Sequence, residues 1–299
     1  MNLVLTVLEI TAPVFALAVV GFVWVRLGFE YRVEFVTRLA MTLSVPCLIF
    51  VALMQTDVDP AALATLSLAA LVTYALLTLA FWGVVAAAGL NRPTYLSPLI
   101  FGNTGNVGLP LALFAFGETG LGFAVVIFAV MAVISFTFGI WLVAGRGSMT
   151  RVIREPLVWG ALLGGLFLWQ GWETPRAVTN TLQLVGQMAI PLMLITLGVA
   201  VARLRPAALG QAVWLSVVKA ALGAGLAYGI GLWFALPPVA LAVLVLQVAT
   251  PVAVTSYLVA TKYGDPARNG ADPDAVAGLV VVSTLLSVVT LPLILALML

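Results

Sequence analysis

Long apolar stretches, separated by short polar or charged breaks, run through the whole chain. Each stretch is close to the roughly 20 apolar residues that an α-helix needs to cross the hydrocarbon core of a bilayer. We therefore predict an all-α membrane protein with ten transmembrane helices. The expected spans are residues 4–25, 36–54, 61–88, 95–116, 120–144, 153–170, 177–202, 207–235, 238–261 and 275–298.

Composition supports the same class. The chain is 63% hydrophobic and 8% charged, whereas soluble domains carry about 25% charged residues. Ten spans with short loops use nearly all of the 299 residues, so we expect no separate soluble domain. The net charge of +2 is spread over many loops and does not indicate nucleic-acid binding. We therefore expect the outer surface of the protein to contact the lipid bilayer.

The basic residues predict an orientation. The loops after spans 1, 3, 5, 7 and 9 share one side and carry eleven basic residues, whereas the other side carries only Arg176. Cytoplasmic loops are enriched in Lys and Arg, so we expect a cell (inner) membrane protein with both termini outside the cytoplasm. The eleven are Arg26, Arg32, Arg38, Arg92, Arg146, Arg151, Arg154, Arg203, Arg205, Lys262 and Arg268.

Prolines recur at a nearly constant offset and predict a duplication. The pairs are Pro13 and Pro156, Pro46 and Pro191, Pro60 and Pro206, and Pro110 and Pro251, which are 143, 145, 146 and 141 residues apart. Because each half has an odd number of spans, five, the second half would have the opposite orientation in the membrane. We therefore expect two inverted repeats, residues 1–144 and 153–299, an arrangement typical of secondary transporters.

Spans 4 and 9, which correspond in the two repeats, are both interrupted. Span 4 contains Gly102-Asn-Thr-Gly-Asn-Val-Gly-Leu-Pro110, and span 9 contains Gln247-Val-Ala-Thr-Pro251. Non-helical backbone at membrane depth occurs where protein buries it or where it lines a cavity, and matching interruptions indicate a binding site. The predicted substrate-binding residues here are Asn103, Thr104, Gly105, Asn106, Gln247 and Thr250, with Gly108, Pro110 and Pro251 shaping the backbone. Capping of the half-helices by the asparagines is the alternative role.

Lys219 is predicted to lie deep in span 8. An intramembrane lysine is costly and is a functional candidate by default. We expect it to supply positive charge to an anionic substrate or to titrate, and the alternative is a lysine bonded to carbonyls of a broken helix for structural reasons. Asp and Glu are absent from spans 3, 4, 8 and 9, which favours an anionic or neutral substrate over Na⁺/H⁺ exchange. Na⁺ coupling through neutral oxygens stays open.

The sequence gives no support for catalysis. Histidine is absent, and the chain contains neither HExxH, nor G-x-S-x-G, nor a pair of intramembrane aspartates. We therefore predict that the protein is not an enzyme and needs no cofactor. A channel is a further alternative, because paired broken helices can line a pore.

The glycine- and asparagine-rich motif resembles the fourth-helix signature of the auxin efflux carrier family, which includes the plant PIN-FORMED transporters and many bacterial members. The segments Pro191–Gly198, Ala249–Pro251 and Gly278–Leu291 are similar to the same family. The resemblance covers the whole chain. On residue matching, Asn103, Asn106 and Pro110 would belong to a first crossover and Pro251 to a second.

The resemblance implies a fold similar to bile-acid and sodium/proton transporters, with spans 4 and 9 crossing at unwound centres. Spans 1, 2, 6 and 7 would form a scaffold, often a homodimer interface, and spans 3–5 and 8–10 would move as an elevator. The implied substrate is a small organic anion such as malate, malonate or an auxin-like acid, carried by a secondary transporter or uniporter. A Na⁺-coupled transporter of a neutral or amphipathic solute is the alternative, and H⁺ coupling also stays open.

Overall fold

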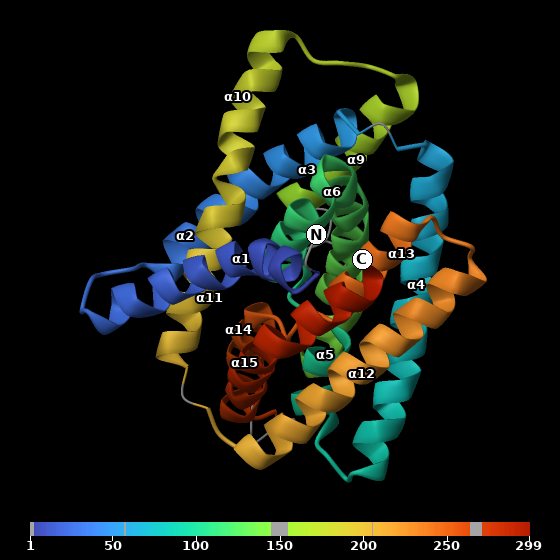
Figure 1. The fold of residues 1–299 in the computed structure, drawn as a ribbon. Coiled ribbons are helices and arrows are strands. Elements are labelled where there is room, and N and C mark those ends of the chain that lie inside the picture. The colour runs from blue at the N-terminus through green and yellow to red at the C-terminus, as the bar shows by residue number, and fades with distance from the viewer. Residues whose placement is uncertain (1–2, 57, 145–154, 205, 264–270) are drawn as a thin grey trace.

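The structure is a computed structural model that describes residues 3–56, 58–144, 155–204, 206–263 and 271–299. All regular elements within these residues are helices, and one isolated antiparallel bridge joins Gly102 to Val252. The all-α prediction is therefore confirmed. The helices cross one another at several angles around a central group that includes α6 and α13 (Figure 1).

The first half of the chain contains α1 (Leu3–Arg26), α2 (Val33–Leu39), η1 (Ala40–Ser44), α3 (Val45–Met54), α4 (Pro60–Ala87), α5 (Arg92–Ile100), η2 (Thr104–Gly108), α6 (Leu109–Ile134), η3 (Ser135–Gly139) and α7 (Ile140–Ala144). The second half contains α9 (Pro156–Gln170), α10 (Arg176–Gln187), α11 (Ala189–Arg203), α12 (Leu209–Trp233), α13 (Pro238–Val248), α14 (Val254–Tyr263) and α15 (Pro273–Met298). The elements η1, η2 and η3 are π-helical turns.

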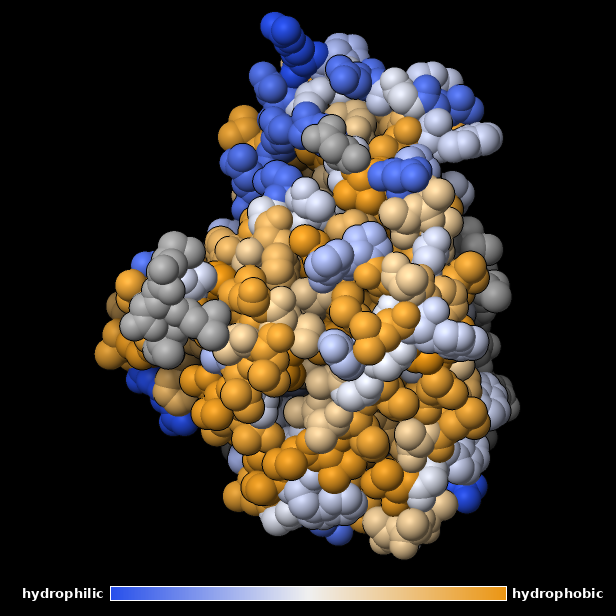
Figure 2. Space-filling view, turned by 45° about the vertical axis from the view of Figure 1, so that its right-hand side comes forward, coloured by the Kyte–Doolittle hydropathy of each residue, from blue (hydrophilic) through white to orange (hydrophobic). Residues whose placement is uncertain are grey.

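The helices have the length and surface of membrane spans. Within the described residues, seven helical runs are long and apolar enough to cross a bilayer, and α9 and α13 are shorter apolar helices. Large apolar side chains are exposed on the outside of the bundle, for example Leu79 on α4, Trp169 on α9 and Val289 on α15. Apolar residues dominate the face in Figure 2, and hydrophilic residues gather at its upper end. The chain is a multi-pass membrane protein.

Several runs are interrupted where the sequence disfavours a continuous helix. Gly117 has a φ of 63° and divides the apolar run from Thr104 to Ala144 into two segments. The π-turn η1 ends two residues before Pro46, which has no N–H to donate and whose ring crowds the preceding turn. The second half has a similar break, because α10 ends at Gln187 and α11 begins at Ala189, shortly before Pro191.

Glycines allow some helices to approach backbone to backbone. A Cβ atom on Gly198 of α11 would overlap the carbonyl oxygen of Ala18 in α1, and one on Gly21 would overlap the carbonyl oxygen of Ile195. Small residues permit this kind of close contact between membrane helices. As a result, α1 packs along α11, whereas α3 packs on α9 and α10. The helix α12 packs on α4, α13 and α15.

Helix boundaries differ from the predicted ones by a few residues. The fourth span begins at Arg92, three residues earlier than predicted, because the side chain of Asn91 accepts a hydrogen bond from the Thr94 N–H and caps the helix. The eighth begins at Leu209, after Ala208 in a left-handed conformation. The predicted start of the sixth span at 153 lies outside the described residues, as do Arg146, Arg151, Arg154, Arg205 and Arg268.

Candidate functional site: the crossing of two interrupted helices

Two helical interruptions meet in the middle of the molecule. The first separates α5 from η2, and the second separates α13 from α14. Gly102 and Val252 form an antiparallel bridge, and the N–H of Asn103 donates to the carbonyl oxygen of Pro251 at 2.7 Å. The two extended segments therefore satisfy part of each other's backbone hydrogen bonding, which a membrane interior requires.

Local sequence explains why these two segments fit together. Gly102 lies so close to Thr250 that a Cβ atom would overlap the threonine hydroxyl. Pro251 cannot donate a backbone hydrogen bond, so it ends the regular pattern of α13. The N–H of Val252 is satisfied by the hydroxyl of Ser283 on α15 at 2.9 Å. The backbone role predicted for Pro251 thus has a hydrogen-bonding basis, and the close approach at Gly102 has a steric one.

The crossing separates positive from negative helix ends. Half-helices α5 and α13 end at the crossing with their C-termini, and η2–α6 and α14 begin there with their N-termini. Unpaired carbonyls give the former a partial negative charge, and unpaired N–H groups give the latter a partial positive charge. An anion would therefore be stabilised on the side of the two N-termini, and a cation on the side of the two C-termini.

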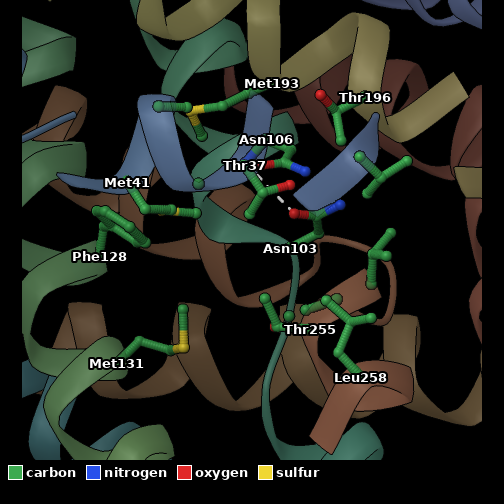
Figure 3. Close-up of a pocket in the computed structure, with 16 residues that line it drawn as sticks. Thr37, Met41, Asn103, Asn106, Phe128, Met131, Met193, Thr196, Thr255 and Leu258 are labelled. Carbon is green, nitrogen blue, oxygen red and sulfur yellow. Dashed lines mark hydrogen bonds between the residues drawn. The ribbon is translucent and has the colours of Figure 1, made fainter. Parts of the chain in front are cut away.

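A pocket of about 70 Å³ lies on the side of the N-termini. It lies between η1, η2, α6, α11 and α14 and is lined entirely by uncharged residues. Its polar groups come from Asn103, Asn106, Thr37, Thr196 and Thr255. In Figure 3 the polar ends of the two asparagines and Thr37 turn toward one another in the centre of the view.

Asn103 has one half of its amide engaged and the other half free. Its Oδ1 accepts a hydrogen bond from the Asn106 N–H at 3.3 Å and so caps the start of η2. Its side chain is buried, and among the described residues its Nδ2 has no hydrogen-bond partner. A buried donor without a partner is costly. Asn103 therefore caps a half-helix, and its Nδ2 remains a buried donor at the pocket.

The remaining predicted residues occupy different surroundings. Gly105 lines the pocket, and Thr104 is fully buried beside it. Gln247 is fully buried, and its Nε2 donates to the Ala124 carbonyl at 3.5 Å while its amide packs on Gly108. These contacts explain why position 108 is a glycine, since a Cβ atom there would overlap the Gln247 amide.

Lys219 and Thr250 lie outside the pocket. Both line a separate cavity of about 10 Å³, together with Ser283 and Ser287 of α15. The Lys219 ammonium donates to the carbonyl oxygen of Leu99, in the last turn of α5, at 2.9 Å. The structure thus brings Asn103, Gly105 and Asn106 together, with Lys219 and Thr250 in the other cavity. The binding roles stay predictions.

Sequence reasoning missed the apolar part of the pocket. Met41, Phe128, Met131 and Met193 line it and come from η1, α6 and α11. Three methionines and a phenylalanine make a wall that is apolar and adaptable, because methionine is flexible and polarizable. The four residues are spread over more than 150 positions of sequence. No local pattern could have grouped them.

A larger hollow adjoins the pocket at one end. It has a volume of about 690 Å³ and shares Val33, Val254 and Leu258 with the pocket lining. Tyr31, at this end, shares a hydrogen bond of 2.7 Å with Thr196 of the pocket. Another hollow of about 490 Å³ lies at the opposite end of the α2–α3 run, where it includes Gln55.

These features define a multi-pass membrane protein with a small uncharged pocket beside two crossed, interrupted helices. Residues 147–295 match the family of proteins described as "Membrane transport protein". The chain belongs to this transporter family, as its resemblance to the auxin efflux carriers predicted. It is also 27% identical to an "Uncharacterized transporter" of Methanothermobacter thermautotrophicus, over 95% of this chain and 96% of that protein.

Proposed function

We propose that this protein is a secondary transporter or uniporter that moves a small organic anion by elevator-type alternating access. The observation that carries the proposal is the antiparallel crossing at Gly102 and Val252, with a pocket on the side of the two helix N-termini. Crossed half-helices whose N-termini face a pocket can hold an anion without a charged side chain. The transporter family provides the general activity, and the pocket provides the substrate chemistry.

The proposed architecture is ten spans in two inverted repeats, residues 1–144 and 153–299. Gly117 supports this count, because it divides the longest apolar run into two segments. Each half then contains a span with a break near a proline (Pro46 or Pro191) and a span interrupted at the crossing. The antiparallel direction of the two crossing segments is what an inverted repeat requires.

The packing of the helices supports a scaffold and a moving part. The proposed scaffold is α1, α2–α3, α9 and α10–α11, in which α1 packs along α11 and α3 packs on α9 and α10. The proposed moving part is α4–α7 and α12–α15. The pocket lies between the two groups, with Met41 and Met193 on the scaffold side and Asn103 and Thr255 on the other. An elevator would carry the second side past the first.

The pocket favours an acid with an apolar body over a highly polar dicarboxylate. Its polar groups gather around Asn103 and Asn106, where a single carboxylate can bind, and Met41, Phe128 and Met193 would contact the rest of the molecule. A second carboxylate would lose its hydration against this wall without gaining a charged partner. Within the proposed class, we therefore favour an auxin-like monocarboxylate over malate or malonate.

A neutral or amphipathic solute, moved with Na⁺, is the second candidate. The uncharged pocket lining favours it, since no side chain there forms an ion pair with a substrate. In either case the larger hollow next to the pocket is at the end of the molecule that carries Arg32 and Arg203. This end is cytoplasmic in the proposed orientation, in which both termini are outside, and the conformation is then open to the cytoplasm.

Uptake into proteoliposomes tests the proposal. Radiolabelled indole-3-acetate, malate and malonate would be compared with and without a Na⁺ gradient, and empty liposomes would measure passive entry. We expect saturable uptake that is highest for indole-3-acetate. Uptake of a neutral amphipathic solute but of none of the three acids would refute the anion proposal. Unitary currents in planar bilayers would instead support a channel.

A further inference from the structure

The surroundings of Lys219 suggest a role different from substrate contact. Its side chain is 3% exposed, and its ammonium donates to the Leu99 carbonyl in the final turn of α5. The salt bridge found within the described residues joins Arg32 and Glu30 at an exposed site, so the partner of Lys219 is a helix end and not a carboxylate. A buried cation is thus balanced by the partial negative charge of a half-helix C-terminus.

The second half-helix contributes to the same cavity. Ala249, Thr250 and Pro251, which follow the C-terminus of α13, line it together with Lys219. The C-terminal end of α5 therefore binds the ammonium directly, and the residues that follow the C-terminus of α13 line the same small cavity. Freed carbonyls and half-helix C-terminal ends are the groups that coordinate Na⁺ in transporters with discontinuous helices.

Hydroxyl groups complete oxygen-rich surroundings. The hydroxyls of Thr250, Ser216 and Ser287 donate to the carbonyls of Gln247, Ala212 and Thr284, each at 2.6 Å. Since each hydroxyl hydrogen is committed to a carbonyl, the oxygen lone pairs are left to accept from a cation. The cavity of about 10 Å³ is at the lower limit for one water molecule. A further cation there would be repelled by the ammonium at close range.

We propose that the Lys219 ammonium occupies the place that a coupling Na⁺ would take at the crossing, as a cation fixed to the chain. The negative helix ends are then neutralised at every stage of the cycle, and transport needs no Na⁺. This inference rests on the proposed transport function. It gives Lys219 a positioning role, because the ammonium fixes the crossing while the substrate binds in the other cavity.

Replacing the fixed cation by a free one tests the inference. Lys219→Ala removes the ammonium and opens space, so methylammonium or Na⁺ can enter. Thermal unfolding of the purified protein would be followed in methylammonium chloride, NaCl and choline chloride at equal ionic strength. We expect Lys219→Ala to melt at a lower temperature than the wild type, and methylammonium and Na⁺, but not choline, to raise its melting temperature in a saturable way.

The matched control is Lys262→Ala, which removes the other lysine of the chain at an exposed position in the last turn of α14. The melting temperature of the wild type, and likewise that of this control, should be the same in all three salts. A response of Lys219→Ala that equals theirs would overturn the inference. If Lys219→Ala does not fold, the wild type decides: equal stability in Na⁺ and choline supports the inference, and a saturable stabilisation by Na⁺ overturns it.

Uptake separates this inference from the proposed function. Indole-3-acetate uptake by the wild type should be the same in NaCl and choline chloride, should be lost in Lys219→Ala, and should return with methylammonium. If methylammonium or Na⁺ restores the stability of Lys219→Ala but no organic acid is taken up, the proposed transport of organic anions is refuted and the proposed role of Lys219 is supported. If uptake by the wild type depends on Na⁺, the proposed transport is supported and the proposed role of Lys219 is refuted.

Discussion

Asn103→Asp is the sharpest perturbation of the proposed anion site, because it changes the free half of the amide and preserves the engaged half. The aspartate can still accept the hydrogen bond that the Asn106 N–H now gives to Oδ1 at 3.3 Å. A carboxylate at the start of η2 is also favourable for the half-helix. The variant should therefore fold, and it should lose the unpartnered Nδ2 donor.

The expected loss of affinity can be worked from these contacts. A hydrogen bond to a charged group contributes about 1.5–3 kcal/mol, which corresponds to about 10- to 150-fold in the dissociation constant. Two like charges about 4 Å apart, at an effective dielectric constant of about 20, add up to roughly 4 kcal/mol of repulsion. We therefore expect binding of an organic monocarboxylate to weaken by at least about 10-fold from the lost hydrogen bond alone, and by more where the two charges repel.

Calorimetric titration of indole-3-acetate and uptake into proteoliposomes would measure the effect. Asn180→Asp, on the exposed side of α10, is the matched control and should bind and transport like the wild type. Thermal unfolding would verify that Asn103→Asp is folded. A folded Asn103→Asp protein with unchanged affinity for the acid would show that Nδ2 does not bind the carboxylate. Increased uptake of a cationic solute by that variant would independently show that the side chain at position 103 faces the substrate.

Three other substitutions test the packing and the pocket. Gly198→Ala should lower the melting temperature through a clash with α1 that costs about 1–3 kcal/mol or more, whereas Gly225→Ala, which meets open space, should not. Met193→Ala should shift transport toward bulkier acids, with about 0.8 kcal/mol gained for each methylene that fills the new space; unchanged selectivity in competition assays would contradict the pocket assignment. Burial raises the pKa of Tyr31, so its hydroxyl stays protonated and donates to Thr196. Tyr31→Phe should cost about 1 kcal/mol at neutral pH, measurable by chemical unfolding.

The sequence predicted the helical class and the interrupted segments because both depend on local chemistry. Gly102 to Pro110 cannot form a regular helix in a membrane at an acceptable cost, and the same holds for the segment around Pro251. Such local conflicts are visible without a structure. The π-turn before Pro46 and the break before Pro191 could not be predicted, because sequence does not determine how a helix relaxes around a proline.

The apolar wall of the pocket depends on tertiary packing. Phe128 and Met193 belong to helices that the sequence separates widely, and each looks like an ordinary core residue in its own span. Gln247 is a polar residue with structural contacts. Its predicted role in substrate binding stays a prediction, and its contacts with Gly108 and Ala124 also connect α13 to η2 and α6. Polarity at membrane depth indicates importance, and only packing distinguishes binding from support.

Lys219 illustrates a limit that applies to any interrupted helix. An interruption creates two helix ends of opposite polarity at the same depth, so sequence depth alone cannot tell which end a charged side chain will reach. In α12 the side chain of Lys219 reaches the C-terminal end of α5, where the Leu99 carbonyl oxygen accepts a hydrogen bond from the ammonium. The pocket on the N-terminal side consequently has no fixed positive side chain. An anion bound there would be stabilised by backbone and amide donors, which discriminate by geometry as well as by charge. The two proposals together assign different roles to the two sides: the Lys219 cavity would neutralise the crossing permanently, and the pocket would bind and release a substrate.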